Sequence, residues 1–213
     1  MGLARGAQQD GGEAARILAA CPVFEVAAGE PHFRASFQRV ELLAVEHGYI
    51  AVRSTPDGLA RSIVTCEGGP GDLLLPPTAD EVLCALAPSR LIGIDRDARD
   101  RLLEVPDLAI SLLQQIVGTL ARKQEALGNF AHTRHVERVR RKLLQLGESY
   151  GRVAHDGIRI DFPISHALLA DMIGSSRETV TRALDELQRT GFVVRDGHTY
   201  RLLVPPERVV RPM

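Results

Sequence analysis

Several features that would place a sequence in a particular protein class are missing from these 213 residues. There is no Trp, and aromatic residues make up only 4% of the chain, so a core would consist mainly of Leu, Val, Ile and Ala. No apolar run approaches the roughly 20 residues that cross a bilayer. The polar residues 1–16 lack the apolar stretch of a secretory signal. We therefore expect a cytoplasmic protein that makes no contact with a membrane.

Cysteine and enzyme motifs are also scarce. Cys21, Cys66 and Cys84 are widely spaced and form no Cys-x-x-Cys pair, which argues against a disulfide framework and favours free thiols. His132 and His135 are neighbours on a helix without an obvious third ligand, so we expect no metal site. The sequence has no GxSxG, HExxH or Walker phosphate loop, and we do not expect an enzyme or catalytic residues.

Charge is present but unevenly distributed. Residues 1–130 hold 12 Lys and Arg against 17 Asp and Glu, a net charge of −5. Residues 131–213 hold 14 against 10, a net charge of +4. A polyanionic partner would therefore meet the second part of the chain, although an excess of this size is weak evidence alone.

The region from Val23 to Ile94 consists of short apolar runs broken by turn residues. Pro56-Asp57-Gly58 is a strong turn signal, and a Gly/Pro-rich loop surrounds residues 73–75. Many short strands at regular spacing predict a small antiparallel barrel or sandwich. Residues 1–16 carry several Gly and Gln and are expected to be loose.

A long helix is predicted after the strands. Pro106 and Asp107 suit a first turn, and no further Pro follows before residue 130. Its apolar stripe consists of Leu113, Ile116, Leu120 and Leu127, with Leu112 and Val117 widening it and Lys123 interrupting it. Such a stripe either packs on its own barrel or pairs with a second copy in a coiled coil.

The segment at the end of this helix, residues 128–133, is predicted to be a hinge. It contains Gly128 and Phe130, and Thr133 can cap the helix that follows. That next helix has an apolar side and a basic side, and Gly151 closes it.

Two further helical segments meet at Gly174. Ser165 can cap the first, and Gly174 can end it in a left-handed conformation. Ser175 can cap the second, with Glu178 completing a capping box. A hairpin around Asp196-Gly197 follows. Helix, tight Gly turn, helix and hairpin together are the outline of a winged helix-turn-helix.

The second of these helices begins with an unusual set of polar residues. Arg177, Glu178 and Thr181 fall in its first turns, and Arg182 follows. In a major groove, Arg can donate two hydrogen bonds to guanine and Glu can accept from cytosine N4. The hydroxyls of Ser176 and Thr179 suit phosphates. The alternative is a plain capped helix with a Glu178–Arg182 ion pair on its surface.

Two stretches resemble the Crp/Fnr family, "GSSRETVTRALDELQRTGFV" and "GNFAHTRHVERVRRKLLQLG". The resemblance covers the chain from about Val23 onward. It implies an α+β protein with a β-roll sensor, a cyclic-nucleotide-binding-like jelly roll, at 17–97, a linker and dimerisation helix at 98–130, and a winged helix-turn-helix at 131–213.

The resemblance also implies a function. The protein would be a homodimeric transcription regulator that binds double-stranded DNA at an inverted repeat and contacts RNA polymerase if it activates. Arg177, Glu178 and Arg182 would read bases. The residues matching phosphate-contact positions are Ser165, Ser176 and Thr179, with the wing residue His198 near the backbone.

The sensor departs from the family pattern. The family usually has Gly-Glu, a short helix and Arg-Ser or Arg-Thr that bind a cyclic phosphate, whereas this chain reads "GGPGDLLLPPTADEVLCAL". Gly71-Asp72 matches the loop ahead of that segment, but Asp80-Glu81 stands near the expected Arg-Ser. Carboxylates would repel a cyclic phosphate, so we expect cyclic AMP not to bind in the usual way.

Other signals stay open. A heme would need an axial Cys or His, and Cys66, Cys84, His32 and His47 are the candidates in the sensor. An iron–sulfur cluster usually needs four cysteines. A redox-, heme- or gas-responsive regulator, an unidentified small-molecule effector and no effector at all remain alternatives, as does a non-specific architectural DNA binder.

Overall fold

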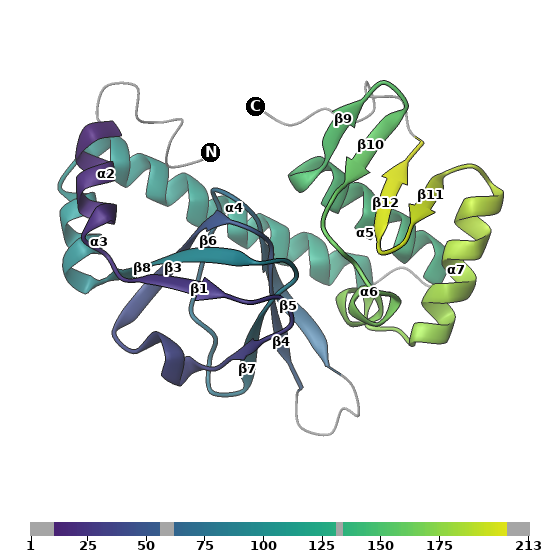
Figure 1. The fold of residues 1–213 in the computed structure, drawn as a ribbon, viewed down its shortest axis with the longest axis horizontal. Coiled ribbons are helices and arrows are strands. Elements are labelled where there is room, and N and C mark those ends of the chain that lie inside the picture. Colours follow the sequence, from purple (N-terminus) through teal and green to yellow (C-terminus); the bar gives the residue numbers. More distant parts are fainter. Residues whose placement is uncertain (1–10, 56–61, 131–133, 204–213) are drawn as a thin grey trace. The chain divides into compact units, whose positions relative to one another are not determined.

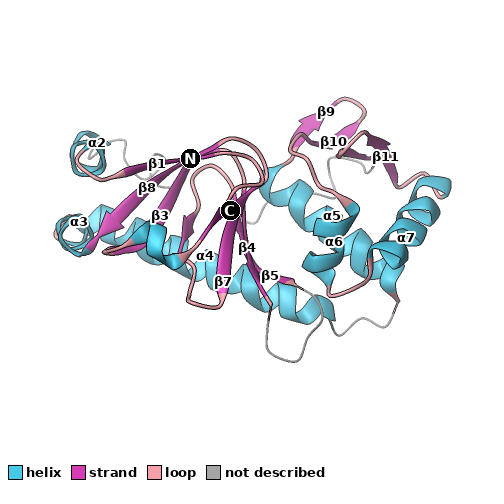
Figure 2. Cartoon of the chain, turned by 60° about the horizontal axis from the view of Figure 1, so that its bottom comes forward, coloured by secondary structure: helices cyan, strands magenta, loops and turns pink. Residues whose placement is uncertain are grey.

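The computed structural model describes residues 11–55, 62–130 and 134–203. The chain divides into two compact units, 1–124 and 125–213, and the division falls inside a long helix, α4 (Pro106–Phe130) (Figure 1). The first unit is rich in strands, and the second places helices beside a small sheet (Figure 2). In the part of the chain that the structure describes, no helix is both long and apolar enough to cross a membrane.

The first unit is a β-roll made of two antiparallel sheets. One has the order β1-β8-β3-β6 and the other β2-β7-β4-β5. Their strands are β1 (Val23–Val26), β2 (Pro31–His32), β3 (Val40–His47), β4 (Ile50–Ser54), β5 (Ile63–Gly68), β6 (Leu73–Leu74), β7 (Glu81–Ala85) and β8 (Ser89–Asp95). A short 3-10 helix, η1 (Arg34–Phe37), follows β2. The predicted small antiparallel barrel or sandwich is thus confirmed in the form of two sheets, while the predicted turn at Pro56-Asp57-Gly58 lies outside the described residues.

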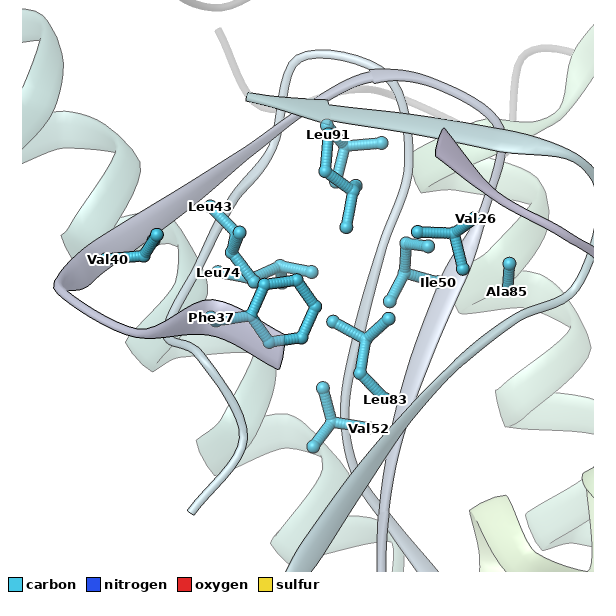
Figure 3. Close-up of a cluster of buried hydrophobic side chains, with 11 residues drawn as sticks. Val26, Phe37, Val40, Leu43, Ile50, Val52, Leu74, Leu83, Ala85 and Leu91 are labelled. Carbon is cyan, nitrogen blue, oxygen red and sulfur yellow. The ribbon is translucent and has the colours of Figure 1, made fainter. Parts of the chain in front are cut away.

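The two sheets enclose one apolar cluster, which Figure 3 shows. Its members are Val26, Phe37, Val40, Leu43, Val45, Ile50, Val52, Leu74, Leu83, Ala85 and Leu91. Phe37 is 0% exposed, and its ring meets that of Phe24 edge to face at 5.1 Å between centroids.

A second apolar cluster lies where helices cover the sheet containing β3 and β8. Side chains alternate along a strand, so Leu43 enters the first cluster while Ala44 enters the second. The helices that cover it are α2 (Gly11–Ala19), α3 (Arg96–Leu103) and α4. Asp95 caps α3 by accepting a hydrogen bond from the Ala98 N–H at 2.9 Å.

Helix α2 corrects the expectation of a loose segment for residues 11–16, while residues 1–10 lie outside the described residues. Residues 11–19 are helical, and Ala14 and Ile17 are buried in the second cluster. Gly11 and Gly12 weaken the local helix signal, but burial of one apolar side against the roll stabilises the helix.

The second unit has the helix order of a winged helix-turn-helix. Its elements are α5 (His135–Tyr150), β9 (Arg152–Ala154), β10 (Gly157–Ile160), α6 (His166–Ile173), α7 (Arg177–Arg189), β11 (Val193–Asp196) and β12 (Thr199–Leu202). The strands form one antiparallel sheet in the order β11-β12-β10-β9. Asp196 pairs with Thr199 across the predicted hairpin turn, where Gly197 has φ 59°. Gly151 ends α5, as predicted.

The predicted hinge is only partly described. Helix α4 continues through Phe130, so Gly128 and Phe130 lie within a helix rather than in a break. One Gly costs a helix about 1 kcal/mol, which a helix of 25 residues tolerates. Thr133 lies outside the described residues, and Arg134 rather than Thr133 is the N-cap of α5, without a side-chain cap hydrogen bond.

We predict that Phe37→Ala destabilises the β-roll by about 3–5 kcal/mol, because it leaves a cavity in the enclosed cluster. Phe33, which is 54% exposed, offers a matched control. Phe33→Ala should change the free energy of unfolding by less than about 0.5 kcal/mol. Urea unfolding followed by circular dichroism measures both variants, and equal losses would contradict the assigned core.

Candidate nucleic-acid interface and sensor pocket

Helices α6 and α7 meet at the predicted tight turn. The Ser165 hydroxyl oxygen accepts a hydrogen bond from the Leu168 N–H at 3.1 Å and so caps α6. Gly174 follows α6 in the left-handed conformation, with φ 60°. Both features were predicted from the sequence, and two serines are all that separates Gly174 from α7.

The cap of α7 differs from the prediction. Ser176, not Ser175, is the N-cap, and its hydroxyl oxygen accepts from the Thr179 N–H at 3.2 Å. Ser175 is buried, and its hydroxyl lies 3.1 Å from His135 Nδ1. Glu178 therefore does not complete a capping box with Ser175. The sequence contains two adjacent serines that could cap α7. Ser175 contacts His135 of α5, and Ser176 is left to cap the helix.

The three predicted base-reading residues lie on the outer side of α7. Arg177, Glu178 and Arg182 are all exposed. The other side of α7 is buried and consists of Val180, Ala183, Leu184 and Leu187. The charged side chains are therefore directed away from the core, at the start of the helix, where they can meet the edges of bases.

The residues predicted to contact phosphates lie at the starts of α6 and α7 and in the wing turn. They are Ser165, Ser176, Thr179 and His198. The Ile164 N–H donates to the His198 carbonyl at 2.7 Å, which ties the wing turn to the start of α6. Helix N-termini favour anions, so these positions suit a phosphate backbone.

One contact between α6 and α7 was missed at the sequence level. His166 Nδ1 lies 2.8 Å from Thr181 Oγ1, and the same hydroxyl donates to the Arg177 carbonyl at 2.9 Å. The sequence predicted Thr181 on the polar surface of α7, but in the structure its side chain contacts His166 of α6. No local pattern could have revealed this pair.

Side chains of helix α5 contact the turn between α6 and α7. Besides the His135–Ser175 contact, the Arg138 guanidinium donates to the Ile173 carbonyl at 3.2 Å. This carbonyl is in the last turn of α6, where backbone carbonyls have no N–H partner within the helix. His135 is thus part of the support of the helix pair, and His132 lies outside the described residues.

A groove of about 970 Å³ runs between α5 and α7. Thr179 and Arg182 of α7 line it, together with Arg134 and Arg140 of α5. The Arg140 guanidinium lies 5.0 Å from the ring centroid of Phe192. The groove joins the charged side of α7 to the start of α5.

Helix α4 has two apolar sides. One side packs on its own roll, where Leu108 and Leu112 are buried and Thr119 Oγ1 donates to the Leu73 carbonyl at 3.2 Å. Leu112 therefore belongs to the core and not to the predicted stripe.

The other side of α4 leaves large apolar side chains exposed, namely Ile110, Leu113, Ile116, Val117 and Leu120. The structure thus adds Ile110 to the predicted stripe. Leu127 is helical, but its side chain lies outside the described residues.

The β-roll contains a pocket of about 460 Å³. Its apolar lining consists of Val40, Val52, Cys66, Leu75, Pro76 and Pro77, and its polar lining of Arg34, Glu41, Thr78, Glu81 and Thr119. Of the two acidic residues that the sequence singled out, Glu81 lines the pocket.

The charged groups of the pocket already have protein partners. The Glu81 carboxylate accepts from Thr65 Oγ1 at 2.6 Å and from Thr78 N–H and Oγ1 at 3.1 and 3.2 Å. The Arg34 guanidinium donates to the carbonyls of Phe37 and Val40. The other carboxylate of the lining, Glu41, accepts from Arg96 and Arg99. An anion entering the pocket would therefore meet two carboxylates and an arginine that already donates to backbone carbonyls.

The cysteines are free thiols. Burial raises the pKa of the Cys21 and Cys84 thiols, which lowers their thiolate fraction at neutral pH. Cys66 lines the pocket. Among the described residues, no group of three or more His, Cys, Asp and Glu side chains could hold a metal ion.

Comparison with known proteins places these features in a family. The Crp-like helix-turn-helix domain matches residues 137–207. The CRP-like cAMP-activated global transcriptional regulator of Mycobacterium tuberculosis is 29% identical over 123 residues, which cover 57% of this chain and 54% of the relative. This match therefore spans about half the length of that curated relative.

A second relative matches a longer part of the chain. The regulatory protein CysR of Synechococcus elongatus is 30% identical over 150 residues, covering 66% of this chain and 68% of the relative. A CRP-family transcriptional regulator from Thermus thermophilus shares the fold, with a TM-score of 0.67 and 23% identity over 88% of this chain and 95% of that chain. The chain therefore belongs to the Crp/Fnr family of regulators.

Proposed function

We propose that this protein is a sequence-specific DNA-binding transcription regulator that acts as a homodimer on an inverted-repeat operator. The observation that carries the proposal is the set of exposed Arg177, Glu178 and Arg182 on a helix whose other side is buried. These residue types can distinguish guanine and cytosine by hydrogen bonds in the major groove. A dimer presents two such helices about one DNA turn apart, roughly 34 Å.

The exposed side of α4 supports the homodimer. Ile110, Leu113, Val117 and Leu120 recur with the heptad spacing of a coiled coil. Burying each of these side chains against a second copy is worth about 1.5–3 kcal/mol before the costs of association. A second copy of the same helix offers the matching apolar surface.

The β-roll pocket is the proposed place for an effector, if one binds. Its lining combines apolar and polar side chains, and its two carboxylates and its arginine already have hydrogen-bond partners. Through the Crp/Fnr fold, a signal there would change how two α4 helices meet and shift the winged helices between two orientations. RNA polymerase is an additional partner if the bound dimer activates transcription.

Leu113→Glu should convert the dimer into a monomer, because it places a charge in the apolar seam. Leu103→Glu is the matched control, since Leu103 is also an exposed leucine but lies on α3. Sedimentation velocity distinguishes the two states. A Leu113→Glu protein that sediments as the wild type does would remove α4 from the dimer interface.

Arg182→Ala should weaken operator binding by about 1–3 kcal/mol and relax the preference at one base of each half-site. The operator is first obtained by selecting bound duplexes from random DNA, and affinity is then measured by fluorescence anisotropy. Arg189→Ala, an exposed arginine at the end of the same helix, should change affinity by less than about 0.5 kcal/mol. An equal loss for all DNA sequences would make Arg182 a phosphate contact and favour non-specific binding.

Cyclic AMP should give no saturable heat in isothermal titration, in contrast to what the name of the M. tuberculosis relative describes for that protein. The reason is the Glu81 carboxylate in the pocket and the engagement of Arg34 by backbone carbonyls. Micromolar binding that cyclic GMP competes away would contradict this prediction. An ultraviolet–visible spectrum of protein purified without oxygen tests the heme and iron–sulfur alternatives.

A further inference from the structure

The Thr181 hydroxyl determines which ring nitrogen of neutral His166 carries the hydrogen. Thr181 Oγ1 lies 2.8 Å from His166 Nδ1 and donates its hydrogen to the Arg177 carbonyl at 2.9 Å. A hydroxyl has one hydrogen, so the hydrogen between Thr181 and His166 has to come from Nδ1. In the neutral ring, Nε2 is then the unprotonated nitrogen.

The free nitrogen of this ring is buried among cations. Nε2 is inaccessible to solvent, and no donor in the described part of the chain reaches it. Among the described residues, those whose charge acts on the ring include Arg195 of β11, Arg177 and Asp185 of α7, and His198 of the wing turn; Asp185 is the one acid of these four. Burial, followed by Arg195 and Arg177, lowers the pKa of His166 below its ordinary value of 6.5. The imidazole is therefore neutral at pH 7 in the DNA-free protein.

We infer that DNA binding transfers a proton from solvent to His166, so that the affinity of the protein for its operator increases as the pH falls. The inference rests on the proposed function, because its trigger is the phosphate backbone. Arg177 belongs to the proposed base-reading set, and His198 to the proposed phosphate contacts. DNA bound there brings negative charge next to the ring and offsets the repulsion from the arginines.

Protonation does not disturb the packing of the two helices. The new hydrogen is added at Nε2, while Nδ1 keeps its hydrogen and its bond to Thr181. The start of α6, where His166 follows the Ser165 cap, thus gains a positive charge without losing the contact with Thr181 of α7. His166 acts as a positioning residue in the free protein and as an added cation in the complex.

The direction of the pH dependence follows from linkage. The pKa of His166 is depressed in the free protein and rises in the complex, so the complex binds more protons than its separate parts. Lowering the pH therefore favours the complex between the two pKa values, by up to about tenfold in affinity per pH unit for each proton taken up. Above both values the ring is neutral in both states and the effect vanishes.

The test measures operator affinity by fluorescence anisotropy between about pH 6 and pH 8, at constant ionic strength because phosphate contacts depend on salt. His166→Gln keeps a polar side chain at this position but cannot be protonated. His155→Gln removes an exposed imidazole from the turn between β9 and β10. We expect wild type and His155→Gln to bind more tightly toward pH 6, and His166→Gln to lose most of that gain.

A further variant distinguishes proton uptake at His166 from proton uptake at His198 in the wing turn. His198→Gln is expected to weaken binding at every pH while keeping the slope, since the proton goes to His166. A slope that persists in His166→Gln, or that disappears in His198→Gln alone, overturns the inference, as does a wild-type affinity independent of pH. Failure of the wild-type protein to bind any selected duplex at any pH overturns the proposed function instead.

Nuclear magnetic resonance gives a readout that does not depend on a variant folding. The His166 ring carbons report its pKa in the wild-type protein, free and bound to the operator. A higher pKa in the complex is the expected result, and equal values in the two states contradict proton uptake at this residue.

Discussion

Helix α7 can keep Arg177 and Arg182 at the surface because its other side is fixed in the core. Val180 is 0% exposed and Leu184 is 1% exposed. Turning the helix far enough to hide an arginine would expose these side chains and bury a charge, which costs several kcal/mol. Packing thus decides which residues can face DNA, and the cap at Ser176 only decides where the helix begins.

The pattern of apolar and turn residues was sufficient to predict a small antiparallel barrel or sandwich, the long α4 and the pair α6–α7, whereas the β-roll was implied by the resemblance to the Crp/Fnr family. Choices between locally equivalent residues could not be predicted. Ser175 and Ser176 have the same capping chemistry, and the outcome depends on His135, which is 40 positions away from Ser175. Ala14 is buried only because strands that come later in the chain form the surface it covers.

The two units handle negative charge in opposite ways. In the second unit, helix starts and exposed arginines are arranged where a polyanion can approach. In the β-roll pocket, the Glu81 carboxylate is stabilised by three hydrogen bonds from Thr65 and Thr78. The sequence revealed that acidic residues replace the expected cationic ones, but only the fold shows that one of them is already satisfied within the pocket.

The contacts of His135 and Arg138 with the turn between α6 and α7 have a mechanical consequence. Both residues belong to the first turn of α5, so this turn and the start of α7 are held to one another by side chains. We therefore expect a rotation of the start of α5 to carry the turn between α6 and α7 with it. The orientation of the proposed DNA-reading side of α7 could then change while its shape stays the same.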